Sequence, residues 1–227
     1  MFALRRPRTR ALLAGVLTLL ALLVGPSGGN ANAAEVSLVA FYNNVGIAQN
    51  PTSGANFDGG GFAYSSIALL AAGVRGGQAV TVDGMTFTWP NRASGLTDNM
   101  TFNGQVIPAV VPGATRIGFL GASTNGPVAT SITLHYRFID ADGELQETAV
   151  EQPITFSDWT LNAGSRPVDP SNTTAISTLF RVSGSTNPEQ VATHVFATSI
   201  PVDPSMSLDS IEFPVETDMH VFGLNIL

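Results

Sequence analysis

The chain has 227 residues, of which 17 are acidic and ten are lysine or arginine, so its formal net charge is −7 at pH 7. A surface of that sign repels phosphate backbones and anionic lipids, which argues against nucleic-acid binding and membrane adhesion. The chain has no cysteine, which excludes disulfides, a thiol nucleophile and a lipidated cysteine.

The first 33 residues have the order of a cleaved secretory signal peptide. Arginines at positions 5, 6, 8 and 10 precede the apolar run 11–24, and the small-residue triplet 31–33 follows. The apolar run is shorter than the roughly 20 residues of a spanning helix, so we expect cleavage after Ala33, secretion, and no membrane insertion afterwards. The adjacent Arg5 and Arg6 leave export of a folded or of an unfolded chain open. Residues 34–227 then carry six arginines, no lysine and 17 acidic residues, a net charge of −11.

Residues 34–227 are predicted to form one all-β domain, because apolar residues recur with a period of two and turn residues separate the runs. A single short helix is expected over 65–74. We predict a two-sheet antiparallel β-sandwich, a jelly roll. The expected strands are 36–42, 78–83, 85–89, 104–110, 115–120, 128–139, 144–150, 153–157, 175–182, 191–200, 208–213 and 219–226.

The segment 41–65 is the most unusual part of the sequence. Amides and one carboxylate, among them Asn43, Asn44 and Asp58, lie in a glycine-rich run flanked by aromatic residues such as Tyr64. Amides and carboxylates suit sugar hydroxyls, and aromatic faces suit the CH face of a pyranose. The alternative is a structural loop in which Asn and Asp side chains bond their own backbone.

A second candidate site is the sequence Asp140-Ala-Asp142-Gly-Glu144. Three carboxylates at alternate positions suit a structural calcium ion, whereas Asp-Gly between two alternating runs is also a strong hairpin signal. We expect no other cofactor. Trp159, at the end of a predicted strand, is a candidate exposed platform for a ligand, although burial is the commoner fate of tryptophan.

Catalytic signatures do not emerge from the sequence. The pentapeptide Gly-x-Ser-x-Gly of serine hydrolases is absent, and the three histidines lack zinc-ligand spacing. His135 is expected on a solvated polar face, and His194 and His220 at the edge of the core. A pair of carboxylates for glycoside hydrolysis cannot be singled out among 17 acids.

Several segments resemble a known family. They are 41–65, the run Val80 to Pro90, the tetrapeptide 96–99, and the segments 117–122, 158–160, 194–198 and 220–223. Together they resemble a β-sandwich domain of secreted actinobacterial proteins that is often attached to extracellular glycoside hydrolases. The resemblance implies a galactose-binding-like, carbohydrate-binding-module-like jelly roll with an accessory role. The sequence departs from this pattern at Thr178–Arg181, where a proline or tyrosine is expected before the arginine, and because no hydrolase is attached.

Three functions remain open at this point. The first is a secreted, non-catalytic binding domain for carbohydrate or another extracellular polymer, with its site on Asn43, Asn44, Asp58, Tyr64 and Trp159. The second is a structural or protein-interaction component of the cell envelope. The third is a secreted glycoside hydrolase.

Overall fold

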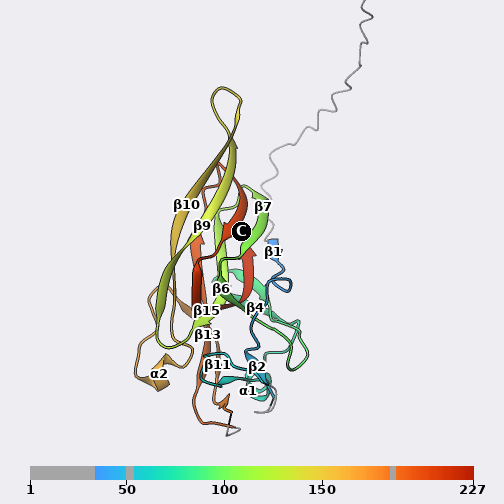
Figure 1. Cartoon of the computed structure of the whole chain (residues 1–227), viewed down its shortest axis with the longest axis vertical. Helices are drawn as coiled ribbons and strands as arrows, with labels where there is room; N and C mark the ends of the chain where they lie inside the picture. The colour runs from blue at the N-terminus through green and yellow to red at the C-terminus, as the bar shows by residue number, and fades with distance from the viewer. Residues whose placement is uncertain (1–33, 50–53, 185–187) are drawn as a thin grey trace, which may run out of the picture. The chain divides into compact units, whose positions relative to one another are not determined.

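The structure, a computed structural model, describes residues 34–49, 54–184 and 188–227. The expected signal peptide, 1–33, lies outside the described residues. Strands dominate the described part, which contains two short helical segments (Figure 1). The predicted all-β class is therefore confirmed.

Two antiparallel sheets form the sandwich. The larger sheet has the order β1-β15-β8-β13-β11, with β6 also paired to β15. Its strands are β1 (Ala34–Val36), β6 (Met100–Asn103), β8 (Arg116–Ser123), β11 (Thr173–Thr178), β13 (Thr193–Pro201) and β15 (Val215–Ile226). The smaller sheet has the order β10-β9-β14-β7. Its strands are β7 (Val106–Pro112), β9 (Val128–Ile139), β10 (Leu145–Phe156) and β14 (Ser207–Glu212).

The pairing of these strands is that of a jelly roll. Strands β9 and β10 pair as a hairpin, and moving outward from its turn β8 pairs with β13, β7 with β14, and β6 with β15. These successive pairs alternate between the smaller and the larger sheet. The chain is thus one long antiparallel hairpin wrapped into two sheets, which is the jelly-roll arrangement. The hairpin β9–β10 extends beyond the other strands in Figure 1.

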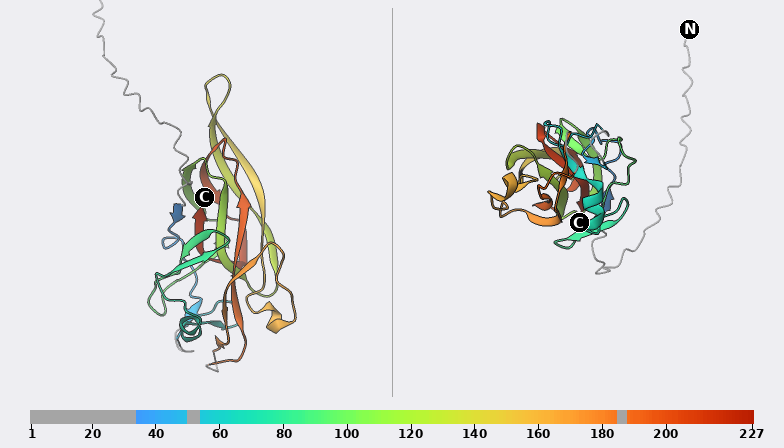
Figure 2. Two further views of the ribbon diagram at one scale, coloured as in Figure 1. Left: turned by 180° about the vertical axis from the view of Figure 1, so that it is seen from behind. Right: turned by 90° about the horizontal axis from the view of Figure 1, so that it is seen from below.

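Strand β8 is buried along nearly its whole length because both faces of the larger sheet are covered. On one face Phe119 lies 6.2 Å from the ring of Phe213, beside the smaller sheet. On the other face, β4 (Ala79–Val82) and β5 (Met85–Thr88) form a hairpin that packs over Gly118 (Figure 2). A Cβ at Gly118 would lie 2.1 Å from the sulfur of Met85. The missing side chain therefore lets the hairpin approach the sheet.

Several sequence predictions differ from the observed strands. The run 175–182 is divided between β11, which ends at Thr178, and β12 (Arg181–Val182), which belongs to another sheet. The run 36–42 is not one strand, because β1 ends at Val36 and the carbonyl of Leu38 accepts hydrogen bonds from the amides of Phe41 and Tyr42 in a turn. The runs 144–150 and 153–157 are joined in the single strand β10, with Pro153 inside it. Proline is tolerated there because β10 lies at the edge of its sheet.

The remaining elements are a small third sheet and two short helical segments. Strands β2 (Ile47–Ala48), β3 (Ala63–Ser65) and β12 (Arg181–Val182) form a three-stranded sheet. Helix α1 (Ser66–Ala71) follows β3, with the hydroxyl of Ser65 accepting a hydrogen bond from the amide of Ala68. This is the helix expected over 65–74. A second segment, α2 (Leu161–Gly164), was not expected; all four of its residues have positive φ, so it is a left-handed turn.

Candidate functional site

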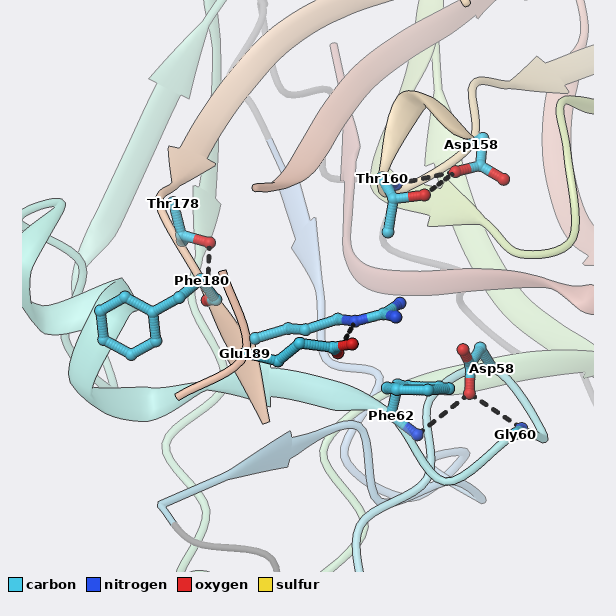
Figure 3. A network of polar contacts seen from close by, with 9 residues as sticks. Asp58, Gly60, Phe62, Asp158, Thr160, Thr178, Phe180 and Glu189 are labelled. Carbon is cyan, nitrogen blue, oxygen red and sulfur yellow. Dashed lines mark hydrogen bonds and ion pairs between the residues drawn. The ribbon is translucent and has the colours of Figure 1, made fainter. Parts of the chain in front are cut away.

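Asn43 and Asp58, two candidates of the loop 43–64, bond to other groups of the protein. The side-chain oxygen of Asn43 accepts hydrogen bonds from the amide and hydroxyl of Thr101, and its Nδ2 donates to the Thr101 carbonyl. One carboxylate oxygen of Asp58 accepts from the amides of Gly60 and Phe62 (Figure 3). Asn43 thus ties the loop to β6, and Asp58 closes a turn. These contacts match the structural alternative that the sequence left open.

Tyr64 and Trp159 lie in the core, with 0% and 2% of their surface exposed. Their rings are 5.1 Å apart, and each lies within about 5 Å of the ring of Phe57. The Tyr64 hydroxyl donates to the carbonyl of His194 at 2.6 Å. Trp159 is therefore not an exposed platform, and Tyr64 presents no face to a ligand. Alternation along a short strand end does not reveal that the loop 54–62 folds back over these rings.

Arg181 covers the outer side of this aromatic cluster. Its guanidinium group lies 3.7 Å from the ring centroid of Phe62 and 5.5 Å from that of Trp159, and its Nε is 2.5 Å from the carboxylate of Glu189. Glu189 and Phe62 are labelled in Figure 3. The arginine at the end of Thr178–Arg181 thus has a packing role.

The candidate calcium ligands form a hairpin turn. Asp140 Oδ1 accepts hydrogen bonds from the amides of Asp142 and Glu144, and Oδ2 accepts from the side chain of Gln146. These hydrogen bonds lower the pKa of Asp140, and the bond from the Glu144 amide has the largest effect. In the described part of the chain, no group of three or more histidine, aspartate or glutamate side chains is arranged to hold a metal ion. Calcium at Asp140, Asp142 and Glu144, one of the two alternatives that the sequence left open, stays untested.

The three histidines have different surroundings. His135 lies on the outer face of the smaller sheet, 2.9 Å from the carboxylate of Glu212, with 36% of its side chain exposed. His194 is half-buried with its Nδ1 3.0 Å from the Ser177 hydroxyl. His220 is buried, and burial lowers its pKa to about 3. His220 is therefore a neutral imidazole at physiological pH.

A buried polar network surrounds His220. Its Nδ1 lies 2.8 Å from Oδ1 of Asn99, and Nδ2 of Asn99 donates to Oδ1 of Asp98 at 2.8 Å. Asn44 joins the network through its Nδ2, 3.3 Å from Oδ1 of Asn99. Asn44 is the one candidate of the loop that reaches this interior group, and it does so as part of the scaffold.

Asp98 is the ionisable centre of the network. It is 4% exposed, and its two oxygens accept hydrogen bonds from the amides of Gly46 and Ile47. Burial raises the pKa of Asp98 to about 6. The hydrogen bonds from Asn99, Gly46 and Ile47 and the positive charge of Arg92 act in the opposite direction and limit this rise. A carboxyl group that titrates near pH 6 at a cleft is a typical mark of a functional site.

The cleft beside Asp98 is the candidate site. It has a volume of about 450 Å³, within the usual range of ligand pockets. It is lined by helix α1, by β2, by the segment 74–76 and by residues 89–94. Leu69 and Trp89 are buried beneath it. Its rim carries exposed polar side chains: Gln49, Arg75, Asn91, Arg92 and Ser94. We call it the Arg75–Arg92 cleft.

The segment Trp89–Arg92, here called the strap, separates this cleft from a second one of about 290 Å³. The second cleft is lined by β1 residues, by the segment 37–42 and by Phe222 and Gly223. The strap is held in place because the amide of Gly77 donates to the carbonyl of Trp89, and that of Trp89 donates to the carbonyl of Gln78. A Cβ at Gly76 would lie 2.7 Å from the side chain of Asn91, so the two segments pack closely.

Sequence reasoning did not identify Arg75, Arg92 or Asp98 as site residues. Trp89, Pro90 and the tetrapeptide 96–99 belong to the family resemblance, and Trp89 also to an expected strand, whereas Asn91 and Arg92 belong to no motif found in the sequence. Arg75, Arg92 and Asp98 line the same cleft because the fold brings distant parts of the chain together there. Arginine spacing gave no signal, since Arg166 and Arg181 lie closer together in sequence than Arg75 and Arg92 do.

The described residues contain no helix long and apolar enough to cross a membrane. No curated protein matches the chain. A family model, the AziU2-like beta-sandwich domain, matches residues 32–226. This match covers almost all of the chain, and its β-sandwich agrees with the jelly roll seen here. The chain therefore belongs to the AziU2-like β-sandwich domain family.

Proposed function

We propose that this protein is a secreted, non-catalytic binding domain that recognises a carbohydrate polymer through the Arg75–Arg92 cleft. The observation that carries the proposal is the pair of adjoining clefts on the two sides of the strap. A ligand with repeating units can occupy both, whereas a single small molecule needs one. Secretion is part of the proposal and is supported by the signal-peptide pattern of residues 1–33.

The chemistry of the rim supports carbohydrate as the ligand class. Asn91 and Ser94 offer amide and hydroxyl groups that donate and accept hydrogen bonds, as sugar hydroxyls require. The apolar floor over Leu69 and Val74 suits the CH groups of a sugar ring. The site includes residues 47–49 of the loop 43–64 but none of the site residues expected from the sequence, while the expected ligand class is kept.

The cleft favours binding over hydrolysis. Asp98 is the one carboxylate among the described residues that line it. The adjoining cleft is lined by Glu35, whose oxygens accept hydrogen bonds from the amide and the hydroxyl of Thr88. Glycoside hydrolysis uses two carboxyl groups that face each other across the scissile bond. The oxygens of Asp98 accept bonds from the backbone of β2 and its neighbour Gly46 instead.

The test is a glycan array followed by a pull-down with insoluble polysaccharides, using the purified protein. Ala93 lines the cleft and is exposed, so Ala93→Trp should fill the cleft and abolish retention. Ala141→Trp at the exposed β9–β10 turn is the matched control and should bind as the parent does. Absence of any retained glycan, or full retention by Ala93→Trp, would contradict the proposal.

A further inference from the structure

The Arg75–Arg92 cleft reverses the charge of the domain around it. Residues 34–227 carry a net charge of −11. The ionisable side chains that line the cleft are two arginines and Asp98, so its formal charge is +1 even with Asp98 ionised. In a strongly acidic protein, a local positive charge of this kind concentrates anions at that place.

The two arginines are not neutralised by the protein. All 17 acidic residues lie within the described residues, and none of them forms an ion pair with Arg75 or Arg92. Arg92 is held by one hydrogen bond from its Nε to the carbonyl of Thr97, 3.1 Å away. Its remaining guanidinium N–H groups are available to a ligand.

A depression on the outer face of the smaller sheet provides the contrast. It has a similar volume, about 450 Å³, and it is also lined by an arginine, Arg137. There the guanidinium group contacts the carboxylates of Glu147 at 3.1 Å and Asp209 at 3.2 Å. His135 is likewise paired with Glu212. The charged side chains of that depression form ion pairs within the protein, whereas Arg75 and Arg92 form no ion pair with the described residues.

The carboxylate of Asp98 does not compete for this role. Its hydrogen bonds go to Gly46, Ile47 and Asn99 on the interior side, and it is nearly excluded from solvent. An anion in the cleft therefore meets guanidinium groups and neutral amides rather than exposed carboxylate oxygens. Guanidinium groups bind carboxylates and sulfates through paired N–H donors, which gives both strength and orientation.

Resting on the proposed function, we infer that the cleft selects glycans that carry an anionic group, either the carboxylate of a uronic acid or a sulfate ester. The guanidinium groups of Arg75 and Arg92 bind the anionic group, and the neutral rim side chains bind the neighbouring hydroxyls. Attraction to the cleft must overcome the repulsion of the domain as a whole. Binding is therefore specific to this place and does not follow from general ion exchange.

The experiment measures the affinity of the purified protein for three soluble polymers by affinity electrophoresis and calorimetry. Polygalacturonate carries carboxylates, dextran sulfate carries sulfate esters, and dextran is neutral. We expect one or both anionic polymers to bind, with an affinity that falls as NaCl is added because salt screens exposed charges. Binding to dextran alone, or equal binding to dextran and the anionic polymers, overturns the inference but leaves the proposed function standing.

Variants locate the site. Arg75→Gln and Arg92→Gln should each weaken binding of the anionic polymer about tenfold, the usual effect of losing one charge-assisted contact. The Arg75 side chain makes no hydrogen bond to the described residues, so Arg75→Gln should keep the parental melting temperature even if Arg92→Gln disturbs the 92–97 turn. Arg116→Gln, on β8, is the control and should bind normally.

The pattern of results separates the two claims. Anionic binding that is lost in Arg75→Gln and kept in Arg116→Gln supports the inference. Anionic binding that is unchanged in both cleft variants places the site elsewhere and overturns it. If none of the three polymers nor any glycan on the array is retained, the proposed function fails and the inference fails with it.

Discussion

His220 and Asp98 are connected through the single side-chain amide of Asn99. The Asn99 oxygen lies 2.8 Å from Nδ1 of His220, and its nitrogen lies 2.8 Å from Oδ1 of Asp98. Since the Asn99 nitrogen donates to the carboxylate, its oxygen accepts, and this shorter contact places the proton of His220 on Nδ1. The Nδ2 of Asn44, 3.3 Å from both Nδ1 of His220 and the Asn99 oxygen, then donates to the oxygen. The amide thus fixes the tautomer of a buried neutral histidine.

The first prediction concerns acid stability. Burial lowers the pKa of His220 from 6.5 to about 3 in the folded protein. Between these two pH values His220 is protonated in the unfolded chain and neutral in the folded protein. The contribution of His220 to stability is therefore fully present above pH 6.5 and decreases as the pH falls toward 3. At pH 4 the loss is about 3 kcal/mol relative to pH 7. Urea unfolding over this pH range measures it.

His220→Asn tests the assignment, because asparagine retains a donor for Asn99 and does not titrate. The variant should be less stable than the parent at pH 7, since it leaves space beside Phe57, whose ring lies 4.0 Å from that of His220. The difference should shrink toward pH 4. Parallel stability curves for parent and variant would show that another group controls the acid response.

The second prediction concerns Asp98. Burial raises its pKa to about 6, and the positive charge of Arg92 opposes that shift. Arg92→Gln should therefore raise the pKa of Asp98 further, whereas Arg116→Gln should leave it unchanged. Carboxyl carbon shifts in an NMR titration report the value directly. A lower pKa in Arg92→Gln would mean that the two side chains do not interact as described.

The sign of the Asp98 effect on stability is opposite to that of His220. The folded protein takes up a proton more readily than the unfolded chain between pH 6 and about 3.8, so this group stabilises the fold progressively as the pH falls through that range. The His220 effect is larger and continues to lower pH. Replacing His220 should expose the weaker, opposite dependence of Asp98.

Much of the jelly roll was accessible from the sequence because its long strands alternate. The strand expected over 128–139 has the observed bounds of β9, and the turn 140–144 joins it to β10. The two-residue alternation of apolar side chains and the residues of a turn are local properties, so they can be recognised in the sequence without knowledge of the fold. The interruption expected between 150 and 153 is absent because β10 continues as an edge strand in which Pro153 is tolerated, which is a property of the whole sheet.

The candidate site was less accessible because its members are distant in sequence and ordinary in type. Asn43 and Asp58 attracted attention by their density of amides and carboxylates, yet backbone groups use those side chains. Trp159 looked suitable as a platform, yet the loop that contains Phe57 covers it. Asp98 is one of 17 acids, and only its burial at a cleft distinguishes it.

The third prediction ranks three glycine substitutions. A Cβ at Gly121 would lie 2.2 Å from the carbonyl oxygen of His220, a backbone atom that cannot move aside. Gly121→Ala should destabilise the protein by about 3 kcal/mol or more. Gly118→Ala should cost less, about 1–2 kcal/mol, because the close atoms belong to the flexible side chain of Met85.

Gly184→Ala is the matched control for this series. Its Cβ would lie 3.9 Å from the nearest atom, so we expect a change of less than about 0.5 kcal/mol. Thermal unfolding of the three variants gives the ranking. Equal stability of Gly121→Ala and Gly184→Ala would show that β8 and β15 do not approach as closely as described.

The fourth prediction concerns the turn at Asp140. Since both oxygens of Asp140 accept hydrogen bonds from the turn and from Gln146, we expect EDTA to leave the melting temperature unchanged. Asp140→Asn should lower it, because an amide offers one acceptor oxygen in place of two. A melting temperature that falls in EDTA and recovers with added calcium would instead establish the calcium site at Asp140, Asp142 and Glu144.

The last prediction concerns Arg181, whose planar guanidinium group covers Phe62 and pairs with Glu189. Arg181→Lys retains the charge but loses the planar stacking, so it should destabilise the protein by about 1 kcal/mol. Arg181→Lys and Phe62→Leu, combined in a double-mutant cycle, isolate the stacking from the ion pair, because Phe62→Leu leaves Glu189 in place. We expect a coupling energy of about 0.5–1 kcal/mol between the two positions. Additive effects would show that Arg181 stabilises this end of the sandwich through Glu189 alone.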